Sequence, residues 1–419
     1  MLYRFYELQR QLLRHAADLA GYLRTTDRAA MDTLDPLHVL RASWALTERL
    51  GKRYPRQPFG ITETARDGQR VAIVEEVVVE GPFCRLVRFR RETEDAATGA
   101  RLAGDPRVLL CAPLSGHHPT LLRDTITTLA AEHDVYVTDW RDARDVPVHE
   151  GELSLADYVE LLVSYITRLG AEDLHVVAVC QPTVPALAAT ALLATRGRTT
   201  PRTLTLLGGP IDARRSPTAV TELARRHPLA WFERTLIHRV PDGYAGAGRR
   251  VYPGFLQLTA FVSMNPARHF EAYHDYWLAH LRGADGAGTI AQHERFYDEY
   301  NAVLDMDARY YLDTVRDVFQ DFALARGIWR VHGELVEPHA ITHTALLTIE
   351  GAADDISGLG QTAAAHELCT GIAEASHRAY VADGVGHYGL FSGSRWREAV
   401  SPQIHGFIRE HARSQEHPA

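Results

Sequence analysis

The sequence lacks the features that mark several large protein classes. Only one of its 45 basic residues is a lysine, Lys52, and the basic residues are spread over the chain without a cluster. The formal net charge of -8 leaves no basic field that would attract nucleic acid or anionic lipid. Charged residues make up 23% and hydrophobic residues 46% of the chain, which is typical of a globular protein and excludes a disordered one.

Cysteine is also scarce. The 419 residues contain four cysteines, too few for a disulfide scaffold, and none of them forms a CxxC pair. They stand at Cys84, Cys111, Cys180 and Cys369. Unpaired cysteines are typical of a reducing compartment, and we therefore expect a cytoplasmic protein.

No long apolar run occurs near the N-terminus, because charged residues interrupt it at Arg4, Glu7, Arg10 and Arg14. This pattern predicts neither a secretory signal nor a membrane span. Apolar residues recur near helical spacing over 1–50, which predicts helix. That helix either packs on the main domain or docks as an amphipathic segment on an apolar surface.

Motifs for phosphate and metal binding are missing as well. Neither a GxGxxG nor a GxxxxGK[ST] loop occurs. The pair His117-His118 has no carboxylate at ligand spacing, and His269, His274 and His280 do not share one helix face. The sequence therefore predicts no metal site and no resident cofactor.

Alternating strands and helices are the main pattern that is present. Two β-branched runs on either side of Gly81-Pro82 predict a hairpin. From residue 107 onward, continuous apolar strands alternate with helices, as parallel strands buried on both faces require. We expect these strands at 107–116, 134–140, 174–180, 203–210, 344–351 and 378–384, and one of the intervening helices near 360–375.

Residues 211–335 interrupt this alternation. They are rich in aromatic side chains and contain Gly-rich joints at 241–248 and 282–288. We interpret them as an inserted, mainly helical lid. The predicted division is an N-terminal helical extension (1–65), an α/β core (66–210 and 336–419) and the lid (211–335).

One strand–turn–helix unit carries the strongest chemical signal. A nucleophile elbow places Ser or Cys on a sharp turn, with small residues two positions before and after it. Here Ala178 precedes Cys180, and Pro182, which suits a first helical turn, stands where glycine is usual. The positive helix N-terminus favours a thiolate. No GxSxG occurs, so Cys180 is either a nucleophile or a small buried apolar residue.

Partners for Cys180 follow in the order nucleophile, acid, histidine that α/β-hydrolases use. Asp354 and Asp355 come after the strand 344–351, and His387 lies in a Gly-rich loop after the last strand. Both positions are at the carboxyl ends of strands, where α/β folds place their sites. We predict His387 as the base and Asp354 as the acid, with Asp355 as the alternative and Asp212 as a weaker one.

An oxyanion hole needs two N–H donors. One is expected from Gln181, directly after the nucleophile, and the other from the loop 114–118. Within that loop we favour the N–H of His117.

Several segments around these residues resemble intracellular poly(3-hydroxybutyrate) depolymerases. The resemblance runs over about residues 1–410, and the Cys-Gln-Pro elbow and the DDISG segment are its most distinctive parts. Ala352-Ala353 replace a more polar pair that usually precedes the two aspartates. The clearest stretches are APLSGHHPTLLRDTI (112–126), VCQPTVPALAA (179–189), LLTIEGAADDISGLGQT (346–362) and GVGHYGLFSGSRWR (384–397).

The resemblance implies an α/β-hydrolase fold and a carboxylic-ester hydrolase that degrades the polymer of native amorphous granules in the cytoplasm. It implies Cys180, His387 and Asp354 as a triad that forms an acyl-thioester. The products would be 3-hydroxybutyrate monomers and oligomers, or thioesters if coenzyme A is the acceptor. The expected partner is the granule surface, not nucleic acid; the oligomeric state is open, with a homodimer as one option.

Three other functions stay open on the sequence alone. A polyhydroxyalkanoate synthase-like acyltransferase uses the same chemistry, although synthases usually carry glycines where this chain has Gln181-Pro182. A non-catalytic granule-associated protein would use the amphipathic N-terminus. A cysteine hydrolase of small esters is the third.

Overall fold

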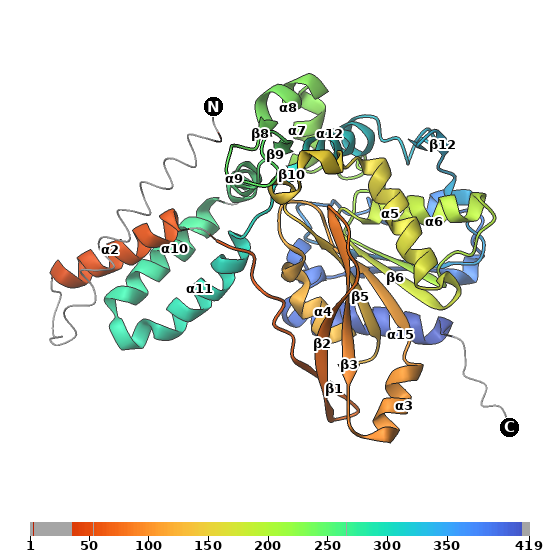
Figure 1. The fold of residues 1–419 in the computed structure, drawn as a ribbon, viewed down its shortest axis with the longest axis horizontal. Helices are drawn as coiled ribbons and strands as arrows, with labels where there is room; N and C mark the ends of the chain where they lie inside the picture. The colour runs from red at the N-terminus through yellow and green to blue at the C-terminus, as the bar shows by residue number, and fades with distance from the viewer. Residues whose placement is uncertain (1–2, 4–35, 53, 265, 413–419) are drawn as a thin grey trace.

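A nine-stranded sheet forms the centre of the computed structural model, which describes residues 3, 36–52, 54–264 and 266–412 (Figure 1). The strand order is β1-β2-β3-β5-β4-β6-β7-β13-β14. The strands are β1 (Glu63–Arg66), β2 (Gln69–Val79), β3 (Cys84–Glu92), β4 (Arg107–Cys111), β5 (Asp134–Trp140), β6 (Leu174–Val179), β7 (Thr203–Leu207), β13 (Ala345–Gly351) and β14 (His377–Ala382).

The sheet divides into an antiparallel edge and a parallel core. β1, β2 and β3 pair antiparallel, and β3 pairs antiparallel with β5. From β5 to β14 every pairing is parallel. All residues of β6, β7 and β13 are buried, as their continuous apolar runs require. With β6 leading into the elbow, this arrangement confirms the predicted α/β-hydrolase fold.

Helices cover both faces of the sheet (Figure 1). α5 (Leu155–Arg168) and α6 (Thr183–Thr195) pack together on one face, and α4 (Arg123–Leu129) and α15 (Ser401–His411) on the other. α6 is apolar around most of its circumference and almost wholly buried, which fits a helix enclosed by the core. α3 (Ala96–Gly104), between β3 and β4, was not predicted.

A helical insertion separates β7 from β13. Its helices α7, α8, α9 and α12 lie at one end of the sheet, and α10 and α11 pack with the N-terminal helix α2 (Pro36–Gly51) as a projecting arm (Figure 1). We call α2, α10 and α11 the arm. The helices of the insertion are α7 (Ala219–Arg226), α8 (Leu229–Leu236), α9 (Gly254–Met264), α10 (Pro266–Leu281), α11 (Ala287–Tyr300), α12 (Ala308–Thr314) and the π-helical turn η6 (Val315–Gln320).

Short elements complete the chain. The insertion also holds the small strands β8 (His238–Arg239), β9 (Arg250–Tyr252), β10 (Met306–Asp307), β11 (Arg330–Val331) and β12 (Glu334–Leu335). The remaining short helices are η1 (Pro119–Leu122), η2 (Ala143–Asp145), η3 (Val148–Glu150), η4 (Ala171–Asp173), η5 (Gly283–Gly286), η7 (Pro338–Ala340), η8 (Glu374–Ser376), η9 (His387–Leu390), α14 (Gly393–Arg395) and η10 (Trp396–Val400).

The helix predicted near 360–375 is wrong. This region consists of turns and the four-residue helix α13 (Ala365–Leu368). The buried Glu350 carboxylate accepts hydrogen bonds from the N–H groups of Gly360, Thr362 and Ala363. The Glu350 carboxylate thus accepts the hydrogen bonds that backbone carbonyl groups would accept in a helix. The local sequence pattern does not reveal this contact.

The structure describes only part of the predicted N-terminal helix. Of the helix expected over 1–50, the structure describes Tyr3 and α2, and the rest lies outside the described residues. No helix among the described residues is long and apolar enough to cross a bilayer. The proposed boundaries at residues 65, 210 and 335 stay predictions.

Candidate active site

Cys180 lies on a strained turn between β6 and α6. Its φ of 66° is in the left-handed region, which costs free energy for any residue with a Cβ. Three hydrogen bonds hold it there: its N–H donates to Leu207 O at 2.7 Å, and the N–H and Oγ1 of Thr183 donate to Cys180 O at 3.1 and 2.8 Å. The left-handed turn therefore points the Cys180 side chain outward at the carboxyl edge of the sheet.

Gly209, after β7, lies directly against this turn. A Cβ at Gly209 would overlap Thr183 Oγ1 and lie 2.5 Å from Cys180 O. The close approach leaves no room for a side chain, so Gly209 is required for the elbow geometry.

His387 and Asp354 meet at the ends of the last two parallel strands. His387 Nδ1 lies 2.8 Å from Asp354 Oδ2, and both side chains are buried. The other oxygen, Asp354 Oδ1, accepts the N–H groups of Ile356 and Ser357 at 2.9 Å each. Asp355, the alternative acid, is exposed. The structure thus brings Asp354 to His387.

Cys180 lies close enough to His387 to act on it electrostatically. Burial lowers the pKa of His387, but its interactions with Cys180 and Asp354 outweigh burial and raise the pKa to about 10. A histidine that a carboxylate holds next to a cysteine is the arrangement expected of a catalytic triad.

The loop 114–118 meets the elbow at Leu114. The Leu114 N–H donates to Gln181 Oε1 at 3.5 Å. His117 lies against the insertion: it forms a bridge with Val303, and its ring Nε2 lies 3.1 Å from Tyr300 O. Burial lowers the pKa of His117 to about 4. These contacts involve the ring and the bridge, so the backbone N–H of His117 as second oxyanion donor stays a prediction.

The remaining polar candidates lie in other surroundings. Asp212 pairs with Arg214 at 2.7 Å instead of approaching His387. Burial lowers the pKa of His118 to about 3. His269 Nδ1 lies 2.9 Å from the hydroxyl of Tyr297, within the insertion. No group of three metal-ligating side chains converges among the residues that the structure describes.

Tyr310, on α12, is a site residue that the sequence did not reveal. Its ring centre lies 6.2 Å from that of Tyr158, whose hydroxyl donates to Ala112 O beside the loop 114–118. The Tyr310 hydroxyl is buried, and no hydrogen bond of good geometry satisfies it. Burial raises the pKa of Tyr310, the side chain of Thr314 lowers it, and the nearby Cys180 raises it to a smaller extent. Nothing in the aromatic-rich insertion distinguishes this tyrosine by sequence.

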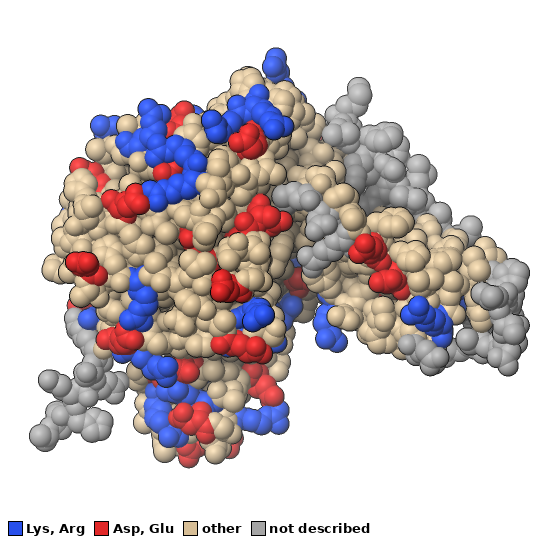
Figure 2. Space-filling view, turned by 180° about the vertical axis from the view of Figure 1, so that it is seen from behind, with Lys and Arg blue, Asp and Glu red and all other residues tan. Residues whose placement is uncertain are grey.

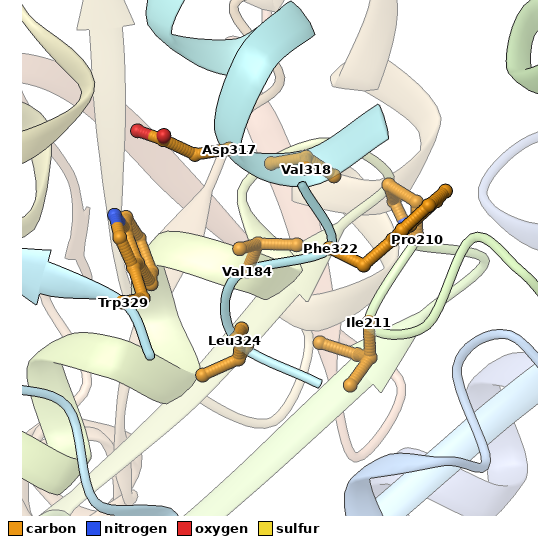
Figure 3. A pocket seen from close by; sticks show the side chains of 8 residues that line it. All are labelled: Val184, Pro210, Ile211, Asp317, Val318, Phe322, Leu324 and Trp329. Carbon is orange, nitrogen blue, oxygen red and sulfur yellow. The ribbon is translucent and has the colours of Figure 1, made fainter. Parts of the chain in front are cut away.

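An apolar slot joins the insertion to the elbow helix (Figure 3). Side chains from α6 and the turn after β7 face side chains from the segment 317–329 across a space of about 10 Å³. The slot is lined by Val184, Pro210, Ile211, Asp317, Val318, Phe322, Leu324 and Trp329. The insertion is therefore closely packed at this side of the site.

Comparison with protein families finds a match in the C-terminal half of the chain. Residues 208–412 match the family described as PHB de-polymerase C-terminus. These residues, just under half of the chain, are similar to the C-terminal part of PHB depolymerases. The match includes Asp354 and His387, whereas Cys180 precedes it. A search of curated proteins found no match to the chain.

Solved structures resemble the chain at low identity. A 2-hydroxy-6-oxo-6-phenylhexa-2,4-dienoate hydrolase from Rhodococcus sp. strain RHA1 is 13% identical, with 81% of this chain and 99% of that chain covered and a TM-score of 0.44. A Paleococcus ferrophilus monoacylglycerol lipase is 14% identical (74% and 96% covered, TM-score 0.43). A Thermogutta terrifontis esterase is 16% identical (84% and 98% covered, TM-score 0.41). These similarities are too low to indicate a shared activity.

Proposed function

We propose that this chain is an intracellular hydrolase of the PHB depolymerase family that cleaves ester bonds of poly(3-hydroxybutyrate) through Cys180, His387 and Asp354. The observation that carries the proposal is the His387–Asp354 hydrogen bond next to Cys180 on a strained elbow. The match of residues 208–412 to the depolymerase family supports the polymer as substrate.

The first half of the reaction transfers an acyl group to sulfur. His387 takes the proton of the Cys180 thiol, and the resulting thiolate attacks an ester carbonyl, so that a C–S bond forms and the carbonyl oxygen takes the negative charge. When the tetrahedral intermediate collapses, the C–O bond breaks and the His387 imidazolium gives its proton to the leaving alkoxide. This yields an acyl-thioester and a polymer chain that ends in a hydroxyl group.

The second half releases the acyl group. His387, now neutral, takes a proton from the incoming acceptor, which is water or the thiol of coenzyme A. The acceptor displaces Cys180 as thiolate, and Asp354 stabilises the imidazolium that forms again. Water gives 3-hydroxybutyrate ends, and coenzyme A gives a thioester.

Donors to the oxyanion come from the elbow, the loop 114–118 and the insertion. The N–H of Gln181 lies on the elbow, and the loop that contacts it offers the N–H of His117 or of Leu114. Tyr310 adds a hydroxyl that, with its raised pKa, stays protonated and can donate at the working pH. We assign it to the same developing charge.

The proposed location is the cytoplasm, at the surface of polymer granules. All four cysteines are free, as a reducing compartment would keep them. Large apolar side chains on the arm are exposed, among them Leu40 (64%), Leu50 (63%) and Phe270 (73%), and they suit contact with an apolar polyester. On the face shown in Figure 2, acidic and basic side chains of the described residues are interspersed, which fits an uncharged substrate.

Product analysis on amorphous granules tests the proposal. Purified protein is incubated with granules, with and without coenzyme A, and the released acids and thioesters are quantified. We expect 3-hydroxybutyrate units in one form or the other, and none from Cys180→Ala. Polymer formation from 3-hydroxybutyryl-CoA would instead support the synthase-like acyltransferase and overturn the depolymerase function.

A further inference from the structure

Two adjacent glycines after β7 lie against both halves of the candidate triad. A Cβ at Gly208 would stand 3.3 Å from Asp354 Oδ2 and 3.5 Å from His387 Cε1. A Cβ at Gly209 would stand 2.5 Å from Cys180 O. Because closely packed atoms pass a shift on to their neighbours, the position of this two-glycine segment affects the spacing between the acid, the base and the nucleophile.

A side chain from the loop that carries the acid holds this segment. We call residues 351–362, which follow β13, the acid loop. Thr362 is fully buried, and its Oγ1 accepts the N–H of Gly209 at 2.8 Å and donates to Gly209 O at 2.9 Å. A hydroxyl group can accept and donate at once, so Thr362 fixes both polar groups of the Gly209 backbone.

Glu350 in turn holds Thr362. Its buried carboxylate accepts the N–H of Thr362 at 2.8 Å and that of Ala363 at 3.0 Å. Glu350 belongs to β13, the strand that leads into the turn at Asp354. The strand that positions the acid therefore also anchors the side chain that holds Gly209.

Other contacts join the acid loop to the segment after β7. The Asp212 N–H donates to Gln361 O at 3.1 Å. A Cβ at Gly358 would overlap Ser216 O, so the two backbones pack directly against each other. Within this packed region, the hydroxyl of Thr362 is the contact at the glycine that lies against the elbow.

We propose that Thr362 is a positioning residue that sets the distance between Cys180 and His387. Its hydroxyl holds Gly209 against the elbow, and Glu350 holds Thr362 on the strand that leads to the acid. Proton transfer from sulfur to imidazole requires hydrogen-bond distance, so a small displacement of the elbow slows the reaction and leaves substrate binding intact. For the reaction that it affects, this role rests on the proposed function, whereas the contacts at the elbow do not.

Steady-state kinetics of Thr362→Val on a soluble 3-hydroxybutyrate tetramer test this role. Valine keeps the shape of the side chain but leaves the Gly209 N–H without its acceptor. We expect kcat to fall about tenfold and KM to change by less than about twofold. Thr362→Ser keeps the hydroxyl and should retain at least about one third of the wild-type kcat.

Thr344→Val is the matched control. Thr344 is also buried, precedes β13 at the end of the strand away from the acid, and donates through Oγ1 to Pro201 O at 2.6 Å. Its loss should lower the melting temperature about as much as Thr362→Val and change kcat by less than about twofold.

Alkylation of Cys180 by iodoacetamide reports the same distance without turnover. The other three cysteines are buried, so the accessible thiol is that of Cys180. A thiol that loses a neighbouring base reacts more slowly, and we expect an about fivefold lower rate in Thr362→Val and an unchanged rate in Thr344→Val. If the wild type does not cleave the tetramer, the proposed function fails, and the alkylation rates alone decide the role of Thr362.

Three results would overturn the positioning role. They are an unchanged kcat and alkylation rate in Thr362→Val, equal losses in Thr362→Val and Thr344→Val, and a serine variant as slow as the valine variant. If Thr362→Val does not fold, Glu350→Gln decides, because it weakens the hold on the Thr362 N–H and keeps the hydroxyl. It should lower kcat about threefold at unchanged KM, and an unchanged kcat in this variant likewise overturns the role.

Discussion

The elbow and the arm of this protein are built in opposite ways. Around Cys180, three backbone-directed hydrogen bonds hold one turn, Gly209 has no room for a side chain, and the adjoining slot has about 10 Å³ of space. At the arm, a cavity of about 1200 Å³ opens beside an exposed Phe270. This difference in packing fits two tasks: bond cleavage needs fixed atoms, whereas holding a flexible chain needs space and apolar surface.

The largest effect is expected from Cys180→Ala. Without the nucleophile, kcat/KM on a soluble 3-hydroxybutyrate oligomer should fall about 10⁵-fold, while the fold stays intact. Steady-state kinetics and thermal unfolding measure the two properties. Cys369→Ala, which removes a buried cysteine of the core, is the matched control. Retained turnover in Cys180→Ala would refute the nucleophile.

Asp354→Asn should reduce kcat about 10³-fold and change its pH dependence. Because the pKa of His387 is raised to about 10, the imidazolium is present below that pH and is lost above it. Losing the carboxylate lowers this pKa, so the alkaline limb of kcat/KM should move to lower pH.

The raised pKa of His387 also makes the stability of the fold depend on pH. The raised pKa of His387 stabilises the folded wild type fully below pH 6.5, and this contribution is lost as the pH rises to about 10. Unfolding by denaturant at several pH values should show a smaller alkaline loss in Asp354→Asn. An alkaline limb at the same pH in both proteins would contradict Asp354 as the partner.

A pair of glycine substitutions compares the two regions by stability. Gly209→Ala forces a Cβ into Thr183 and Cys180 and should cost about 3 kcal/mol of unfolding free energy. Gly288→Ala, in α11 of the arm, meets no atom within 4 Å and should add about 0.5 kcal/mol through helix propensity. Thermal and chemical unfolding measure both. Similar values for the two variants would remove the contrast in packing.

Tyr310→Phe deletes one hydroxyl and keeps the ring. If the hydroxyl donates to the oxyanion, kcat should fall about 30-fold with little change in KM. A purely structural tyrosine would instead change the melting temperature and leave kcat within twofold. Steady-state kinetics on the soluble oligomer, together with thermal unfolding, distinguish these outcomes.

The smallest effect is expected from Leu40→Ser on the arm, at a side chain that is 64% exposed. Loss of exposed apolar area should slow granule turnover about threefold and leave turnover of the soluble oligomer unchanged. Val148→Ser removes an apolar side chain that is 55% exposed outside the arm and should change neither rate. Equal losses on both substrates would argue against the arm as the granule-facing region.

Local patterns determined much of this protein. The strands at 134–140 and 174–180 were predicted to within one residue, because continuous apolar runs bounded by turns depend on near neighbours in the chain. The spacing around Cys180 predicted a sharp strand-to-helix turn, and its φ of 66° agrees with that expectation. The roles of Cys180, Asp354 and His387 remain predictions, although the structure joins the three side chains.

Tertiary structure alone decided the rest, since it depends on residues far apart in sequence. Glu350 holds the N–H groups of the turns after Asp354, where a helix was expected. The bridge of His117 with Val303 joins the loop 114–118 to the insertion, and it cannot be read from either segment. The ion pair of Arg49 with Asp298 likewise joins α2 to α11 only in the folded chain.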